Sequence, residues 1–461
     1  MDFYLSRMRW LLTLAGGVAV VALAACGGGD DRTPTPSPSP TATPTARPGV
    51  TPGPGVSDTE IRLGMTNDLA GEGGTPYAAV TASVQAYIAQ VNQELGGVCD
   101  RDLVVIAADD SYTPEIALRE TQRLVEKEDV LAIIGAQNTD VHLAVAPYLN
   151  DPDGDEDTGD GVPDLFLSTG WSGWGIVDSF PWSIGFIPDY ASDGEIIGKY
   201  IEERLPEKKI GLLYENSNFG RDYRAALERV FVGDEVLVAS VAYDVEQGGD
   251  EAEPTPVDGD PTPTPAVRPL LQELIDAGAE VVVLGTTPAV SAEVFKIANA
   301  GDLISQFILS YVNTPSTLAA EIGGGTQADS LLEGFEQLSG SVVSKYMLNL
   351  VEDEGSPELI EHQRIMETYD GPPVTTLSIY GQALAETVVE TLSRACDQLD
   401  REGVLQAAES LSGFQPSVLL PGIEVNLSSE DHRAIEAMQP VMIEADGSLT
   451  EIGEPISAEG R

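Results

Sequence analysis

The sequence predicts an α/β protein with two parallel β-sheets, and three observations lead to this fold class. The chain has 461 residues, enough for two or three domains with substantial cores. Short apolar runs of about five residues, without polar alternation, are typical of strands that are buried on both faces. These runs alternate with segments of helical periodicity, and that alternation makes the sheets parallel.

The first sheet is expected from strand, loop and helix units that begin at residue 61. Val80, Val84 and Ile88 continue a helical spacing that predicts a helix over residues 80–95. Thr113 and Pro114 supply an N-cap and a proline at the first position of a second helix. The expected strands of this part cover residues 61–65, 103–107, 130–134 and 165–167.

The second sheet is expected because the same alternation starts again after residue 209. Helices are expected around residues 221–230 and 289–298. The expected strands cover residues 210–214, 236–242, 281–284 and 307–309.

The N-terminal segment has the pattern of an export signal. Arg7 and Arg9 precede an apolar run over residues 10–25, which is short for a membrane span. The run ends in Leu23-Ala24-Ala25-Cys26-Gly27, which resembles the bacterial lipobox. This resemblance implies a signal peptide over residues 1–25 and a lipid on Cys26, and the alternative is ordinary secretory cleavage with a free cysteine. Residues 26–55 are rich in Pro and Thr, so we expect an extended tether there.

The charge of the chain limits its partners. It has 24 Lys and Arg against 75 Asp and Glu, a net charge of −51. Such a surface repels nucleic acid and bare anionic lipid. With 42% hydrophobic residues, the chain still has enough apolar material to fold. The acidity fits both a salt-adapted and a simply very soluble extracellular protein.

Few enzyme classes fit this sequence. It contains three histidines, which leaves little for imidazole-based zinc sites or Ser-His-Asp catalysis. No strand is followed by a nucleotide-binding glycine pattern, and Gly170-Trp171-Ser172-Gly173 lacks the spacing of a nucleophile elbow. We therefore expect a protein that is not an enzyme and needs no catalytic cofactor.

Polar and aromatic residues follow the expected strands, at the edge of a parallel sheet where ligands bind. Hydroxyls, amides and aromatic rings suit the capture of a small polar molecule. The alternative is that these residues only cap helices. The segments concerned are 67–77, 135–139, 168–171, 215–219, 285–287 and 310–311.

Eight short motifs occur in an order that resembles the type I periplasmic binding fold. Within that fold they resemble the leucine/isoleucine/valine-binding family of substrate-binding proteins for ABC importers. The motifs are residues 61–64, Gly96-Gly97-Val98 with Arg101, Asp109-Asp110 with Pro114, Ile134-Gly135 with Thr139, Phe180-Pro181-Trp182, Tyr214-Glu215-Asn216 with Phe219-Gly220, Ala277-Gly278-Ala279 with residues 281–283, and Leu420-Pro421-Gly422-Ile423.

The resemblance implies two Rossmann-like lobes, joined by a three-segment hinge, that close on a ligand. Lobe 1 would consist of residues 56–187 and 338–420, and lobe 2 of residues 188–337 and 421–461. The crossovers would lie near residues 183–188, 337–341 and 417–422.

The resemblance also implies a ligand site between the lobes. Thr139, Ser168 and Thr169 match positions that hold a ligand carboxylate, and Tyr77 and Phe219 match aromatic positions of the cleft. Thr286, Thr287 and Tyr311 fall near contacts of the second lobe. Trp171 lies near the expected cleft mouth, where its alternative role is ordinary packing. The family usually places a carboxylate after the strand at 307–309 to pair a ligand ammonium, but residues 310–313 contain none.

The function implied is capture of a small ligand for an ABC permease by a lipid-anchored, extracytoplasmic protein. The ligand would be an amino acid, a related carboxylate or an amide, and we expect a monomer. A ligand sensor without a transport role is the main alternative, and a structural lipoprotein is a third.

Two acidic insertions, at 150–164 and 244–265, lie outside this pattern. In the first, Asp153, Asp155, Asp157 and Asp164 have the spacing of a calcium loop, although Thr158 stands where glycine is expected. The alternatives are a structural Ca²⁺ site and a solvated acidic loop.

Two cysteines, Cys99 and Cys396, remain if Cys26 carries a lipid. Export to an oxidising compartment allows a disulfide between them, and two buried thiols are the alternative.

Overall fold

A computed structural model describes residues 53–69, 77–155, 158–233, 235–244, 266–299, 306–350 and 352–458. The predicted signal peptide, Cys26 and most of the tether and of the second acidic insertion lie outside these residues. None of the helices in the described part of the chain combines the length and the apolarity that a membrane crossing requires.

The first sheet of the described chain has five strands in the order β2-β1-β3-β4-β5, and all neighbouring pairs are parallel. The strands β1, β3, β4 and β5 are almost entirely buried because helices cover both faces, as the apolar runs predicted, whereas the edge strand β2 is mostly half-buried. They are β1 (Glu60–Asn67), β2 (Asp102–Asp109), β3 (Ala132–Ile134), β4 (Asp164–Leu167) and β5 (Ser183–Gly185).

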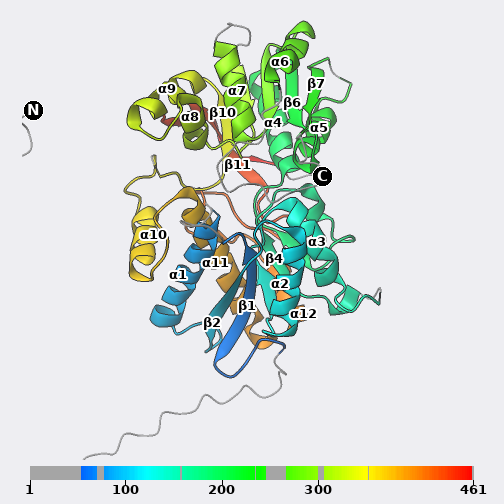
Figure 1. Ribbon diagram of the computed structural model, residues 1–461, viewed down its shortest axis with the longest axis vertical. Coiled ribbons are helices and arrows are strands. Elements are labelled where there is room, and N and C mark those ends of the chain that lie inside the picture. Colours follow the sequence, from blue (N-terminus) through cyan, green and yellow to red (C-terminus); the bar gives the residue numbers. More distant parts are fainter. Residues whose placement is uncertain are drawn as a thin grey trace, which may run out of the picture. The chain divides into compact units, whose positions relative to one another are not determined.

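Helices from both ends of the folded chain surround this sheet (Figure 1). Pro114 opens one of them at the position that the sequence predicts. The helices are α1 (Ala78–Gln90), α2 (Pro114–Glu126), α3 (Thr139–Asn150), α10 (Pro357–Thr368), α11 (Thr376–Arg394) and α12 (Arg401–Glu409). Short single turns are η1 (Val91–Leu95), η2 (Thr158–Asp160), η3 (Ser172–Gly175) and η4 (Ala395–Asp397).

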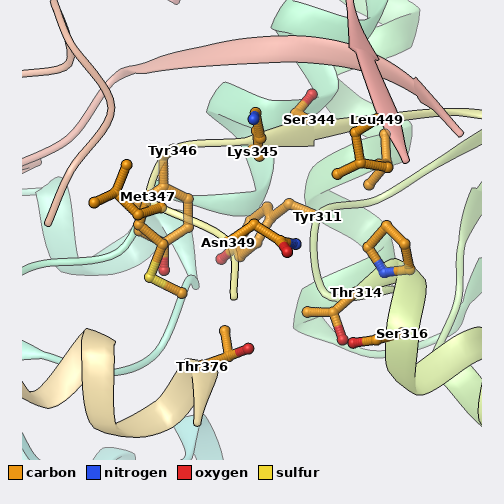
Figure 2. A pocket seen from close by; sticks show the side chains of 13 residues that line it. Tyr311, Thr314, Ser316, Ser344, Lys345, Tyr346, Met347, Asn349, Thr376 and Leu449 are labelled. Carbon is orange, nitrogen blue, oxygen red and sulfur yellow. The ribbon is translucent and has the colours of Figure 1, made fainter. Parts of the chain in front are cut away.

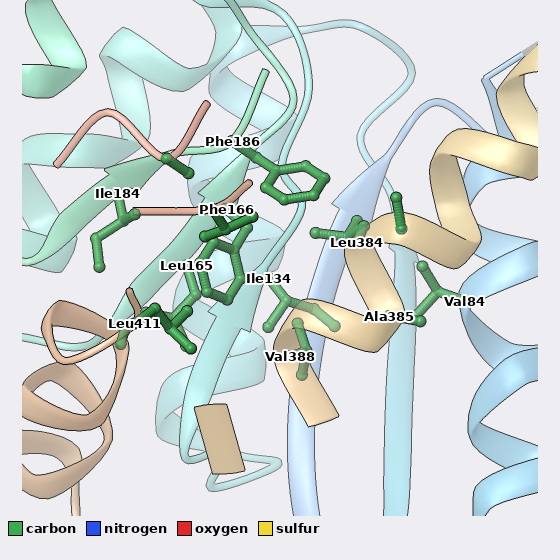
Figure 3. Close-up of a cluster of buried hydrophobic side chains, with 14 of the residues drawn as sticks. Val84, Ile134, Leu165, Phe166, Ile184, Phe186, Leu384, Ala385, Val388 and Leu411 are labelled. Atoms are coloured by element: carbon green, nitrogen blue, oxygen red, sulfur yellow. The ribbon is translucent and has the colours of Figure 1, made fainter. Parts of the chain in front are cut away.

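The core of the first lobe lies between α11 and the sheet. Figure 3 shows Leu384, Ala385 and Val388 of α11 against Ile134 and the β4 side chains. All of the labelled side chains belong to one buried cluster. Burying such apolar surface is the largest favourable term in folding, so this contact fixes α11 on the sheet.

The second sheet has the order β12-β11-β10-β9-β8-β6-β7, and β13 pairs with β11. The strands β6, β7, β8 and β9 are parallel, as predicted. Strand β10, which is parallel to β9, and the antiparallel strands β11, β12 and β13 were not predicted. The strands are β6 (Ile210–Glu215), β7 (Leu237–Tyr243), β8 (Val281–Gly285), β9 (Gln306–Leu309), β10 (Val342–Lys345), β11 (Ala437–Ile443), β12 (Leu449–Glu451) and β13 (Ile456–Ser457).

The helices of the second lobe come from one stretch of the chain, between the first crossover and β10. They are α4 (Tyr190–Arg204), α5 (Asn218–Val230), α6 (Val267–Asp276), α7 (Pro288–Asn299), α8 (Pro315–Gly323) and α9 (Ala328–Leu338). The chain is therefore an α/β protein with two largely parallel sheets.

The crossovers between the sheets lie beside one another. Met347 in the second crossover forms a β-bridge with Leu419 in the third. Gly185, at the end of β5, forms a β-bridge with Arg433, which also belongs to the third connecting segment. Two predicted boundaries are too early. Residues 338–420 were expected in the first lobe, but β10 pairs with β9 in the second sheet. Residues 421–461 were expected in the second lobe, but Ile423 is buried in the first core.

A disulfide joins Cys99 to Cys396, with a Cα–Cα distance of 5.4 Å. It connects the loop before β2 to the end of α11, which are 297 positions apart in the sequence. The cross-link ties together the two separate chain segments that build the first lobe.

Replacing both cysteines with serine is expected to lower the free energy of unfolding by about 2–5 kcal/mol, because the cross-link restricts the unfolded chain. Urea unfolding of the double variant and the wild type measures this difference. The wild type in the presence of a reductant is the control and should match the variant. Equal stability of all three samples would contradict the prediction.

Candidate functional site

Thr139 lies at the start of α3, in a loop whose conformation depends on glycine. Gly135 has a φ of +61°, and an added Cβ there would lie 2.5 Å from Leu384 of α11. Asn138 is the N-cap of α3, and its side chain accepts a hydrogen bond from the N–H of Val141 at 3.0 Å. These contacts hold the first turn of α3 at the carboxyl end of β3.

Two of the three predicted carboxylate-binding hydroxyls meet in the structure. Thr139 Oγ1 and Thr169 Oγ1 share a hydrogen bond. Ser168 is directed differently, since its Oγ lies 2.6 Å from the hydroxyl of Tyr380 on α11. Ser168 therefore joins the loop after β4 to α11, and the paired hydroxyls are those of Thr139 and Thr169.

Aromatic rings gather in the second lobe around Tyr190, the first residue of α4. The ring centroid of Tyr190 lies 4.8 Å from that of Phe219 and 6.1 Å from that of Tyr311. Tyr311 also donates a hydrogen bond from its hydroxyl to the carbonyl of Pro188 at 2.8 Å. Sequence reasoning named Phe219 and Tyr311 but missed Tyr190, whose only sequence signal is its place after the N-cap Asp189.

The first lobe adds a second aromatic pair. Tyr77 and Tyr112 stack with a centroid distance of 5.9 Å, and they are 41% and 39% exposed. Burial raises the pKa of Tyr190 to about 12, and the nearby Tyr77 hydroxyl adds to this rise. Tyr77 is therefore close enough to Tyr190 to influence it electrostatically, although the two residues come from different lobes.

The two threonines after β8 lie in different surroundings. Thr286 is fully buried, its Oγ1 lies 2.6 Å from Ser291 Oγ, and its carbonyl accepts a hydrogen bond from Asn313. These contacts hold the loop after β8, and a contact of Thr286 with a ligand stays a prediction. Thr287 is partly buried and hydrogen-bonds Tyr243.

Trp171 packs onto its own lobe. Its ring packs edge to face against the rings of Trp174 and Phe180, with centroid distances of 5.1 and 6.1 Å. This arrangement agrees with the packing role that the sequence left open, and it builds a firm base under η3.

The first acidic insertion does not form the twelve-residue calcium loop that the spacing suggests. Asp164 is buried in β4, where its Oδ2 accepts hydrogen bonds from His142 Nε2 at 2.6 Å and Ser183 Oγ at 2.8 Å. Asp157 lies outside the described residues. Asp151, Asp153 and Asp155 instead each bring one carboxylate oxygen within 4.8 Å of the others. Asp164 is therefore removed from the predicted calcium ligands.

A small pocket lies beside Tyr311, next to the second crossover (Figure 2). Thr376 of α11 lies on one side of it, and Thr314 and Ser316 of the α8 start lie on another. Lys345 also lines it, but its ammonium is 3.3 Å from Glu352 and 3.9 Å from Glu451. The lining is therefore rich in neutral hydrogen-bonding groups, and its one cation is already paired.

A model of the periplasmic binding protein family matches residues 60–448, which covers the first sheet, the second sheet except β12 and β13, and every described loop of the site. The chain belongs to the periplasmic binding protein family. This is a family of solute-binding proteins and not of enzymes. The resemblance to leucine/isoleucine/valine-binding proteins and the two-lobe type I periplasmic binding fold are thereby confirmed.

Solved structures of similar fold cover most of the chain. A branched chain amino acid ABC transporter protein from Thermus thermophilus with bound valine is 18% identical, with a TM-score of 0.65, over 87% of this chain and 97% of that one. A fatty acid ABC transporter substrate-binding protein from Thermomonospora curvata is 20% identical, with a TM-score of 0.64, over 89% and 96%.

A third structure widens the range of bound molecules. A solute-binding protein of an ABC transporter from Rhodopseudomonas palustris BisB5, in complex with 3,4-dihydroxy benzoic acid, is 18% identical, with a TM-score of 0.62, over 87% and 98%. No curated protein matches the chain. At these identities the solved structures support the fold alone.

Asp193 is a buried carboxylate beneath the aromatic cluster. Its Oδ2 accepts hydrogen bonds from Tyr223 Oη at 2.6 Å and from the N–H of Tyr311 at 3.1 Å. Burial raises its pKa to about 6, although these hydrogen bonds act in the opposite direction. The folded state therefore binds this proton more tightly than the unfolded state.

The stability of the protein is expected to fall through Asp193 as the pH rises from about 4 to about 6, because the unfolded carboxyl ionises first. Between pH 4 and pH 7 the wild type should lose about 2 kcal/mol more unfolding free energy than Asp193→Asn, which cannot titrate there. Urea unfolding at several pH values measures both. Parallel pH profiles would contradict the prediction.

Proposed function

We propose that this protein captures a small carboxylate or amide, including amino acids, between its two lobes and delivers it to an ABC permease. We propose further that it works outside the cytoplasmic membrane, as a monomer held by a lipid on Cys26. The observation that carries the ligand-binding proposal is the hydroxyl pair of Thr139 and Thr169 near Tyr190, whose N–H donates to the carbonyl of Gly170 at 2.7 Å.

The chemistry of this site suits an anionic group attached to an apolar body. Thr139 belongs to the first turn of α3, and a helix N-terminus favours negative charge. Two hydroxyls add hydrogen-bond donors, while Tyr190, Phe219 and Tyr311 supply apolar and aromatic surface. The solved structures of similar fold bind valine and 3,4-dihydroxy benzoic acid, which agrees with a carboxylate as the shared feature.

The loop after β9 bears on whether the ligand carries an ammonium group. Residues 310–313 contain no carboxylate, and Asn313 is buried with its amide bound to Thr286 and Ser310. An ammonium left unpaired in a closed cleft is costly. A carboxylate without an α-ammonium therefore fits these residues better than an α-amino acid does.

A thermal-shift screen tests the proposal. The panel contains branched and aromatic amino acids, aliphatic and aromatic carboxylates, short amides and urea. A solute at a hundred times its dissociation constant stabilises the folded state by about 2.7 kcal/mol, which gives a clear rise in melting temperature. A hit establishes solute binding, and the comparison of amino acids with matched carboxylates decides the ammonium question. If no member of the panel raises the melting temperature, the proposal is contradicted.

Thr139→Ala is expected to weaken binding of the solute identified in this way by about 1–3 kcal/mol, the usual effect of a lost hydrogen bond to a charged group. Isothermal titration calorimetry measures the change. Thr450→Ala is the matched control, because it removes the same hydroxyl from β12, where Thr450 bonds Glu444. Equal affinity of Thr139→Ala and the wild type would exclude Thr139 as a ligand contact.

We also propose that the carboxylates of the half-buried Asp151 and the exposed Asp153 and Asp155 bind Ca²⁺ as a structural ion. Millimolar calcium is then expected to raise the melting temperature of the wild type, and Asp153→Asn with Asp155→Asn should abolish the rise. Magnesium, which prefers a stricter octahedral shell, is the control. Equal responses of the wild type and the variant would favour a solvated loop.

A further inference from the structure

Two hydrogen bonds cross directly from the first lobe to the second at Ser172. Its backbone N–H donates to Asp222 Oδ2 at 2.9 Å, and its Oγ donates to Asp222 Oδ1 at 2.8 Å. Both carboxylate oxygens are thus engaged by one residue of the opposite lobe. Hydrogen bonds to a charged acceptor are about twice as strong as neutral ones.

We propose that Asp222 is a positioning residue that holds the ligand-binding loop of the first lobe in place when the lobes close, so that ligand affinity includes these two bonds. The inference rests on the proposed solute-binding function. It adds a residue that touches no ligand and that the sequence analysis did not consider.

The Ser172 side of the contact is held firmly by its own lobe. Ser172 begins η3, and Trp174 of the same turn is 1% exposed and packs with Ala146 and Leu167 of the first lobe. An added Cβ at Gly173 would lie 2.3 Å from the Trp171 ring, so this close packing requires glycine. The donors of Ser172 are therefore preorganised before Asp222 arrives, and little entropy is lost when the bonds form.

The Asp222 side is also fixed by its neighbours. Tyr223, the next residue of α5, is fully buried and donates its hydroxyl to Asp193 at 2.6 Å. Phe219 lies one turn earlier on the same face of α5, because residues three apart in a helix are neighbours. The candidate aromatic contact and the interlobe contact therefore move together with α5.

The same coupling holds in the first lobe. Thr169, one of the paired hydroxyls, is three residues before Ser172, and both belong to the segment that follows β4. Ligand contacts and the interlobe contact thus share one segment in each lobe. A ligand that contacts Thr169 and Phe219 therefore draws together the same two segments that carry Ser172 and Asp222.

The position of this contact relative to the crossovers gives it a role in closure. A further interlobe contact of this segment, from Tyr190 N–H to the Gly170 carbonyl at 2.7 Å, lies five residues after the end of β5. It is close to the hinge, so a change of angle between the lobes moves it little. Asp222 lies on α5, which belongs to none of the three crossover segments, so we expect opening of the lobes to separate it from Ser172.

The test is a double-mutant cycle with Asp222→Ala and Ser172→Ala, titrated with valine, 3,4-dihydroxybenzoate and the rest of the solute panel. Asp222→Ala should weaken binding about tenfold, mainly through faster dissociation, with the association rate changed less than about threefold. Ser172→Ala should have a smaller effect because its N–H remains. The double variant should bind no more weakly than Asp222→Ala alone.

Glu228→Ala is the matched control, because Glu228 is an acid on the same helix that pairs with Arg224 of its own lobe. It should leave affinity and dissociation rate unchanged. A lost structural contact would lower the melting temperature of the ligand-free protein, whereas loss of the interlobe contact should change dissociation without that decrease. If Asp222→Ala does not fold, the cycle uses Asp222→Asn in its place.

The outcomes separate this proposal from the function on which it rests. A wild type that binds nothing in the panel overturns the proposed function and this inference with it. Wild-type binding with an unchanged dissociation rate in the Asp222 variant overturns this inference alone, as do additive effects in the cycle. The inference is supported if Asp222→Ala dissociates faster, if the effects of Asp222→Ala and Ser172→Ala are not additive, and if Glu228→Ala changes neither affinity nor dissociation rate.

Discussion

The packing of α11 onto β3 and β4 is the contact on which the candidate site depends. Leu384 occupies the space that the absent side chain of Gly135 leaves, and the hydroxyl of Tyr380 bonds Ser168. One helix therefore fixes the two loops that carry Thr139 and Thr169. The apolar face of α11 provides the energy, and its polar contacts set the positions of the loops.

The sequence was sufficient for the elements whose signals are local. Strands buried on both faces leave uninterrupted apolar runs, so the eight expected strands are present. Loops that follow parallel strands meet at one edge, and the family resemblance assigned Thr139 and Thr169 to one site there, where the structure pairs their hydroxyls. The family motifs extended this to two lobes and a hinge.

The features that were missed depend on contacts between distant segments. Nothing near Ser168 in the sequence indicates that its hydroxyl will hydrogen-bond Tyr380. Likewise, nothing near Thr286 indicates that Asn313 will donate a hydrogen bond to its carbonyl. Asp164 has the spacing of a metal ligand, but its neighbour in space is His142. Strand β10 is four residues long and is not followed directly by a helix, so the second crossover was placed too early.

The disulfide between Cys99 and Cys396 has a consequence for the covalent integrity of the molecule. The second lobe, except for its C-terminal strands, is inserted between these two cysteines. A single peptide-bond cleavage anywhere in that insertion would leave the two fragments covalently joined through the first lobe. In an extracytoplasmic environment that contains proteases, the protein can therefore be cut once in the second lobe without releasing either half.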